Sequence, residues 1–243
     1  MMWLAVLALG LVAGTLSGIV GFGASIMLMP ALMLAFGPQE AVPIMAIAAL
    51  LANFSRVVVW WREVDWRANA YYCVTAIPAA ALGARTLLIL DPRVVEGTLG
   101  ALFLLMIPAR RWLLAQGLRI QAWHLLLVGA GIGFLSGMVA STGPINTPFF
   151  LAYGLIKGAY LATEAMGSMA IGITKALVFR RFDALPFETV LHGLIIGASL
   201  MVGSRLAKGF VLRLDAHQFR VLMDCLLAGA GIVLLAGAFA LAH

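Results

Sequence analysis

The sequence predicts an all-α protein that crosses a membrane several times and is built from two homologous halves. Hydrophobic residues make up 63% of the 243 residues, and charged residues only 11%. Residues 1–39 and 120–156 contain no Asp, Glu, Lys or Arg, whereas one membrane-spanning helix needs only about 20 apolar residues. A soluble core of this length could not bury so much apolar surface, so the surrounding solvent is expected to be lipid.

An internal repeat within the two charge-free stretches predicts the duplication. Both stretches carry three glycines and a serine at a constant separation of 119 residues: Gly10, Gly14 and Ser17-Gly18, then Gly129, Gly133 and Ser136-Gly137. Glycines at every fourth residue share one helix face and let helix backbones approach closely. Shorter echoes follow in the same order, such as Gly83-Ala84-Arg85 and Gly203-Ser204-Arg205. We therefore predict a first repeat over residues 1–118 and a second over residues 119–243, within a single membrane domain.

Each half is expected to contain four apolar segments. They lie near residues 3–36, 40–61, 69–90, 94–113, 121–155, 160–179, 187–206 and 217–241. The first and fifth are too long for one crossing, so each is either a tilted, broken span or a hairpin with a short second limb. The N-terminus lacks a basic region and a clear cleavage site, so it is expected to be a retained first helix and not a signal peptide.

The distribution of Lys and Arg over the loops favours inverted halves. If every segment crosses once, the halves are parallel and each side of the membrane holds seven loop cations. If the first and fifth segments are hairpins, the halves are inverted, with ten cations on the side of the 110–119 linker and four on the other side (Arg85, Arg93, Arg180 and Arg181). Because cytoplasmic loops are enriched in Lys and Arg, the linker is expected to be cytoplasmic and both termini external.

Both charge-free stretches contain a break that a helix cannot continue cheaply. The breaks read Gly21-Phe22-Gly23-Ala24-Ser25 and Ser141-Thr142-Gly143-Pro144-Ile145-Asn146. Within a helix Gly costs roughly 1 kcal/mol and Pro about 3 kcal/mol, and freed amides in lipid survive only where they line protein or a wet cavity. A half-helix starting after each break would present N–H groups and a positive dipole end to an oxyanion. The alternative is a kink without contact to a substrate.

Two cations lie at equivalent depth in the second segment of each half. Arg56 follows Asn53, and Lys175 occupies the corresponding place in the repeat. Such residues imply a cavity or a counter-ion, unless the side chains extend along the helix to the membrane surface. The predicted substrate-binding set combines these cations with the breaks: Gly21, Gly23, Ser25, Asn53, Arg56, Ser141, Thr142, Gly143, Asn146 and Lys175.

The other polar residues carry weaker signals. Glu164, Asp183, His192 and Asp224 are candidates for a protonatable partner, but each is expected to be a helix-end or packing residue. Cys73 and Cys225 have no metal or redox spacing and are expected to fill the core. No enzyme motif is recognisable and no cofactor or metal is predicted. The net charge of +6 is scattered over short loops, so no nucleic-acid partner is expected.

At these residues the sequence resembles the TauE/SafE family of sulfite and organosulfonate exporters. The resemblance spans essentially the whole chain and rests on four features: the duplicated glycine-serine start, the prolines that close it (Pro30 and Pro148), the Asn53–Arg56 pair and the Gly-rich third segment. It implies a multi-pass carrier in the bacterial inner membrane that moves a small sulfur-containing or carboxylate anion, often outward, using the proton gradient. Membrane lipid is the expected surrounding partner, and a homodimer is left open. An intramembrane enzyme and a non-transporting membrane subunit are the alternatives.

Overall fold

A computed structural model describes residues 2–20, 23–117, 119–139, 142–155 and 157–210, together with positions 228 and 232. These parts of the chain contain helices and no strand, which confirms the predicted all-α class. The predicted eighth segment, residues 217–241, lies outside the described residues except for those two positions.

The helices follow the predicted segments. In chain order they are α1 (Met2–Val20), α2 (Gly23–Phe36), α3 (Pro38–Trp60), the 3-10 helix η1 (Trp61–Glu63), α4 (Trp66–Ile89), α5 (Pro92–Ala115), α6 (His124–Met138), α7 (Gly143–Tyr153), α8 (Lys157–Arg181) and α9 (Phe187–Phe210). The first and fifth segments each contain two helices, α1 with α2 and α6 with α7. Val139 and Thr142 are not helical, which confirms the second predicted break. Residues 21 and 22 of the first predicted break lie outside the described residues.

Local sequence signals explain where several helices begin and end. Gly37 joins α2 to α3 at a φ of 80°, a left-handed conformation that glycine adopts without a steric penalty. Asp65 caps α4, because its carboxylate accepts a 2.9 Å hydrogen bond from the Ala68 N–H and satisfies a free amide of the first turn. Gly154, at a φ of 109°, ends α7 in the left-handed conformation common at helix C-termini.

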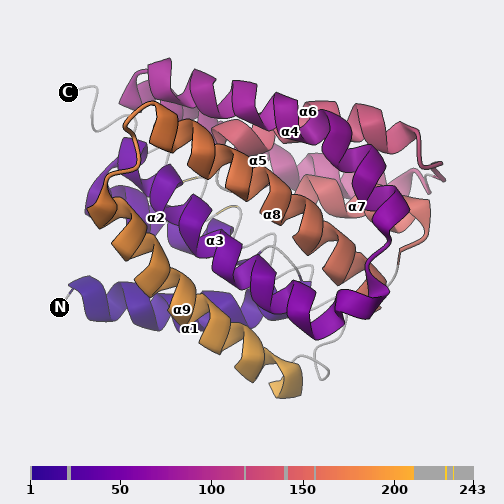
Figure 1. The fold of residues 1–243 in the computed structure, drawn as a ribbon, viewed down its shortest axis with the longest axis horizontal. Coiled ribbons are helices and arrows are strands. Elements are labelled where there is room, and N and C mark those ends of the chain that lie inside the picture. Colours follow the sequence, from indigo (N-terminus) through magenta and orange to yellow (C-terminus); the bar gives the residue numbers. More distant parts are fainter. Residues whose placement is uncertain are drawn as a thin grey trace.

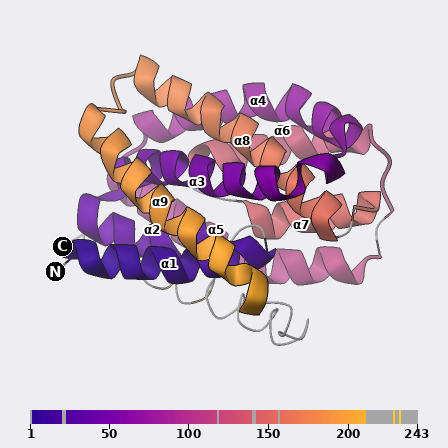
Figure 2. The same ribbon diagram turned by 60° about the horizontal axis from the view of Figure 1, so that its bottom comes forward.

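Helices from the two predicted halves are interleaved. Helix α1 packs on α9, α4 packs on α6, and α3 and α8 lie against each other between these pairs (Figures 1 and 2). In both views the orange α9 crosses the indigo α1, while α4 and α6 lie together on the opposite side of α3 and α8. Each of these three pairs therefore joins a helix from residues 1–118 to one from residues 119–243.

The glycine repeats lie at these helix crossings. A Cβ atom at Gly14 would collide with the Leu200 backbone of α9, and one at Gly133 would collide with the Ala76 backbone of α4. The facing helices also contribute glycines to these contacts: Gly83 of α4 faces the backbone of α6, and Gly203 of α9 faces the backbone of α1. The prediction that the glycine ladders pack helices together is confirmed.

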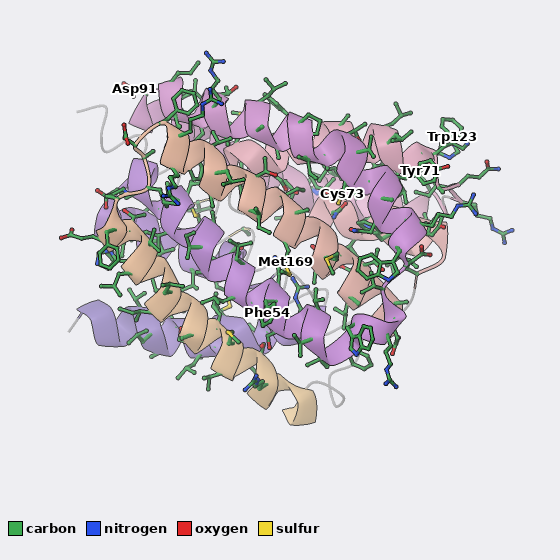
Figure 3. All side chains as sticks on the ribbon, in the orientation of Figure 1. Phe54, Tyr71, Cys73, Asp91, Trp123 and Met169 are labelled. Carbon is green, nitrogen blue, oxygen red and sulfur yellow. The ribbon has the colours of Figure 1, made fainter. Side chains whose placement is uncertain are left out.

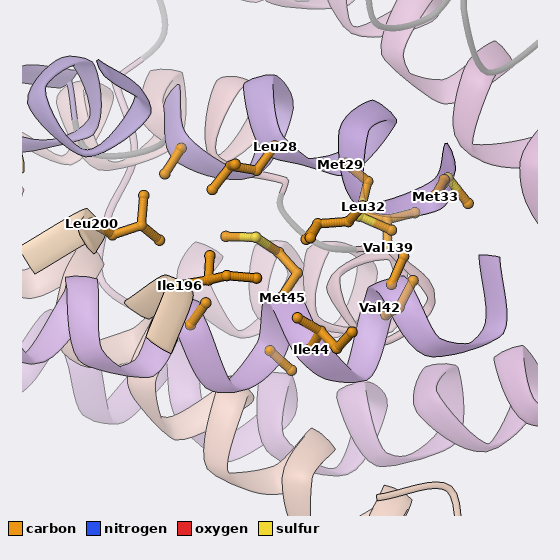
Figure 4. Packing of buried hydrophobic residues seen from close by; sticks show 14 of the residues in the cluster. Leu28, Met29, Leu32, Met33, Val42, Ile44, Met45, Val139, Ile196 and Leu200 are labelled. Atoms are coloured by element: carbon orange, nitrogen blue, oxygen red, sulfur yellow. The ribbon is translucent and has the colours of Figure 1, made fainter. Parts of the chain in front are cut away.

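Buried apolar side chains form two clusters. The larger one joins α2, α3 and α9, where Leu28 and Leu32 face Ile44, Met45 and Ile196 (Figure 4). The second lies at the other side, where Tyr72 of α4 packs on Phe150 of α7 with their ring centroids 5.3 Å apart.

The outer surface is also apolar. Exposed large apolar side chains occur along most helices. Figure 3 shows the two ends of the longest axis, with Tyr71 and Trp123 at one end and Asp91 at the other. Among the described residues, three helices are long and apolar enough to cross a membrane: Glu40–Glu63, Trp66–Ile89 and Phe187–Arg205. Shorter apolar helices cover Val6–Gly18, Met27–Phe36 and His124–Met138. Apolar surface inside and outside is the pattern of a polytopic membrane protein.

Candidate functional site

A small polar cavity lies between the two broken segments and the central helices. Its volume is about 50 Å³, whereas one water molecule needs roughly 10–15 Å³. The start of α2 contributes Ala24 and Ser25, and the start of α7 contributes Thr142 and Gly143. The rest of the wall includes Ser17 of α1, Ser136 of α6, Asn53 and Arg56 of α3, and Glu164, Ser168 and Lys175 of α8.

The N-terminal ends of two helices lie at the cavity. Helices α2 and α7 begin at Gly23 and Gly143, and residues of both first turns line the wall. The first amides of a helix lack partners within it, and the helix dipole places roughly half a positive charge at this end. Two such ends on one cavity favour a bound anion.

A buried ion pair forms one wall. The Arg56 Nη1 donates a 2.8 Å hydrogen bond to the Glu164 Oε2, and the exposed fractions of the two side chains are 6% and 3%. Arg56 also donates from Nη2 to the Asn53 Oδ1, and the Ser168 Oγ donates to the Glu164 Oε1 at 2.7 Å. The Arg56 Nε has no hydrogen-bond partner among the described residues. One N–H of this cavity-lining guanidinium therefore retains donor capacity.

Lys175 also lines the cavity and is held by the C-terminal end of α6. Its Nζ donates to the Ser136 and Val139 carbonyl oxygens at 2.9 Å and 3.1 Å. These are carbonyls that the end of α6 leaves without partners inside the helix. Lys175 therefore satisfies a helix end and also brings a positive charge to the cavity wall.

Hydroxyl groups complete the second break and the helix that follows it. The Ser136 and Thr142 hydroxyls are hydrogen bonded to each other, which connects α6 to the start of α7. One turn further along α7, the Thr147 Oγ1 contacts the Tyr160 hydroxyl at 2.6 Å and donates to the Gly143 carbonyl at 2.7 Å. Thr147 is therefore engaged within the protein and does not line the cavity.

The structure brings most of the predicted binding residues together. Those that line the cavity are Ser25, Asn53, Arg56, Thr142, Gly143 and Lys175. Gly23 is the first residue of α2, next to the wall, and Asn146 is buried in α7 but does not line the cavity. Gly21 and Ser141 lie outside the described residues.

The structure rules out one alternative and overturns one expectation at this site. Arg56 does not extend to the membrane surface, because it is buried and pairs with Glu164. Glu164 is not a helix-end or packing residue, because its carboxylate is buried in α8 and accepts hydrogen bonds from Arg56 and Ser168. The sequence signal was present, since Glu164 is the one acidic residue in the apolar segment 160–179, but its partner lies 108 residues away.

The other protonatable candidates lie elsewhere. Asp183 is the second residue beyond the end of α8, in an exposed turn at a φ of 55°, as expected of a helix-end residue. His192 packs on Phe36 with their ring centroids 5.0 Å apart, as expected of a packing residue. Asp224 and Cys225 lie outside the described residues, and Cys73 is a half-buried free thiol. Within the described ranges, no cluster of three or more His, Cys, Asp or Glu side chains could hold a metal ion.

The sequence was compared with models of known protein families, and one family matches nearly the whole chain. The chain matches the family described as Sulfite exporter TauE/SafE over residues 6–234. The chain belongs to this family. Comparisons with curated proteins and with solved structures gave no match. Membership of TauE/SafE and the apolar helices together make the protein a multi-pass membrane transporter of the sulfite-exporter type.

Proposed function

We propose that this TauE/SafE member is a secondary carrier that binds one small oxyanion in the cavity between α2, α3, α7 and α8. The substrate class is sulfite, an organosulfonate or a small carboxylate. The observation that carries the proposal is that Arg56 and Lys175, from corresponding segments of the two halves, line the same buried cavity as the starts of α2 and α7.

Charge and size both support a small oxyanion. With Glu164 ionised, the three ionisable side chains of the wall (Arg56, Lys175 and Glu164) carry a net charge of +1, and the two helix ends add roughly half a charge each. The volume of about 50 Å³ corresponds to a few water molecules. A sulfonate or sulfite group is of that size, whereas a nucleotide or a lipid headgroup with its chains is not.

We infer that the two halves are inverted repeats and that alternating access occurs around the cavity. Three contacts support this. Gly158 packs against the side chains of Glu63 and Trp60, the Ile120 N–H donates to the Ala152 carbonyl at 3.2 Å, and the Arg85 guanidinium lies 5.8 Å from the Phe182 ring centre. Parallel halves would separate Glu63 from Gly158, and Arg85 from Phe182, by the thickness of the membrane. Inverted repeats around a shared site are a common design of secondary transporters.

The description of the family as sulfite exporters supports outward transport. We propose export across a bacterial inner membrane, linked to the proton-motive force. Reconstituted vesicles test the carrier function directly. Vesicles loaded with unlabelled sulfite or sulfoacetate should accumulate the same radiolabelled anion transiently by counterflow, and protein-free vesicles should not.

The counterflow assay also distinguishes the two other classes of function. A covalently altered product recovered from the vesicles would indicate an intramembrane enzyme. Binding without counterflow would indicate a non-transporting subunit. Either result would overturn the carrier.

A further inference from the structure

We propose that the anion replaces Glu164 as the partner of Arg56, that Glu164 then takes up a proton, and that the anion and this proton cross the membrane together. The inference rests on the proposed function, since it assigns the proton site of the same cavity. It makes Glu164 the residue that couples anion movement to proton movement.

The geometry gives the anion and Glu164 the same position on Arg56. The Glu164 Oε2 accepts from the Arg56 Nη1 at 2.8 Å, and both side chains line the cavity. An anion that reaches the guanidinium therefore meets a carboxylate already on it, and two like charges at one donor repel each other. The Arg56 Nε, which has no hydrogen-bond partner in the described part of the chain, offers a first contact from which an oxyanion could displace the carboxylate.

Once displaced, the carboxylate has few other ways to be stabilised. Glu164 is 3% exposed, and a buried carboxylate without a cationic partner tends to take up a proton instead of remaining charged. Ser168 still reaches its Oε1 at 2.7 Å, and this hydroxyl can serve either protonation state because it can donate or accept.

Among the described residues, the other groups that face Glu164 do not replace Arg56. Tyr72 of α4 and Tyr160 of α8 interact electrostatically with Glu164, but neither brings a positive charge. Lys175, the other cation of the cavity wall, has its Nζ on the Ser136 and Val139 carbonyls. With Glu164 protonated, the three ionisable side chains of the wall carry a net charge of +2, which matches a divalent oxyanion.

Coupling of this kind decides which part of the proton-motive force drives transport. A dianion that crosses with one proton moves one net negative charge. The inside-negative potential then favours export, while a pH difference that is acidic outside opposes it. The carrier is thus a proton–anion symporter whose outward movement depends on the membrane potential.

Calorimetry of anion binding to the purified protein tests the inference. Sulfate and sulfoacetate are suitable probes, because both are dianions that do not take up a proton themselves near neutral pH. Titrations in buffers with different heats of ionisation give the number of protons taken up per anion bound. We expect about one proton for the wild type, since a single carboxylate changes state, and about none for Glu164→Gln.

Glu188→Gln is the matched control, because Glu188 is exposed in the first turn of α9 and should leave proton uptake unchanged. Ser168→Ala keeps the inference testable should Glu164→Gln fail to fold. Without the hydroxyl the ionised carboxylate of Glu164 is less favoured. The pH at which anion binding falls to half of its maximum should therefore be higher than in the wild type.

The outcomes separate the inference from the proposed function. Anion binding by the wild type without proton uptake, or equal uptake by Glu164→Gln, overturns the coupling role and leaves the carrier intact. An unchanged pH dependence in Ser168→Ala also contradicts it. If neither dianion binds and sulfite shows no counterflow, the proposed function fails and the inference fails with it.

Discussion

Arg56 is held from two helices, by Asn53 one turn away in α3 and by Glu164 in α8. Both contacts use the terminal nitrogens of the guanidinium, whose planar fork fixes the orientation of the group. Removing one member of a buried ion pair leaves the other as an uncompensated charge, which typically costs about 3–5 kcal/mol. Substitutions at this pair therefore affect stability and binding together, and an experiment has to separate the two effects.

Arg56→Gln should weaken anion binding by about 1–3 kcal/mol, the range for losing a charge-assisted hydrogen bond. Arg56→Lys should recover part of the loss, because the charge remains while the planar fork does not. The measurement is the anion concentration that gives half-maximal thermal stabilisation of the purified protein.

The double variant Arg56→Gln/Glu164→Gln is the control for stability. It removes both charges of the pair, so it should unfold at a higher temperature than Arg56→Gln alone and still bind anions weakly. Lys175→Gln should also weaken binding, but less, because Lys provides a point charge without the fork. If the Arg56→Gln protein binds the anion with wild-type affinity but is recovered in a smaller amount, Arg56 serves insertion or folding and not binding.

At the scale of helices, the two apolar segments that contain the predicted breaks at 21–25 and 141–146 form four helices in the described part of the chain. Two of these, α2 and α7, begin at the cavity. The sequence predicts these breaks because Gly and Pro are local signals that need no tertiary context. It does not predict that α1 packs on α9 or α4 on α6, because these pairings join segments far apart in the chain. The pairing of Glu164 with Arg56 was not predicted for the same reason, because the two residues are 108 positions apart in the chain.

Gly23→Val and Gly143→Val are expected to insert and fold but to lose transport. Each substitution adds a β-branched side chain at the start of a half-helix, where backbone is proposed to meet the substrate. The measurement is counterflow normalised to the amount of protein in the vesicles. If both variants transport normally, the breaks are kinks that do not line the pathway.

Gly133 and Gly131 provide a matched pair on α6. A Cβ at Gly133 would collide with the Ala76 backbone of α4, whereas one at Gly131 would meet nothing within 4 Å. Gly133→Ala should therefore destabilise the protein by about 1–3 kcal/mol through overpacking. Gly131→Ala should leave it unchanged or stabilise it by up to roughly 1 kcal/mol, since Ala favours a helix over Gly. Thermal unfolding of the two variants measures the difference, and equal melting temperatures would contradict close packing of α6 on α4.

At the scale of the whole molecule, the interleaving of the two predicted halves explains why a buried charged cavity is tolerated. Helices α3 and α8 carry the charges, and the pairs α1–α9 and α4–α6 flank them on both sides. Charged side chains within a membrane protein are stable where they face the bundle interior and pair with one another. The halves thus shield each other's polar residues from lipid.

The orientation of the halves gives a prediction that is independent of the substrate. In a variant without native cysteines, single cysteines at the exposed positions Gln116, Arg62 and Phe182 should divide into two groups towards a membrane-impermeant thiol reagent. Inverted halves place residues 116 and 62 on the cytoplasmic side, where loop cations are most numerous, and residue 182 on the other side. Parallel halves would place all three on one side. Comparing the labelling of intact cells with that of inside-out vesicles measures the side on which each cysteine lies. Labelling of residues 62 and 182 from the same side would rule out the inverted arrangement. Helix α8 would then run in the opposite direction from the one that brings Gly158 to Glu63.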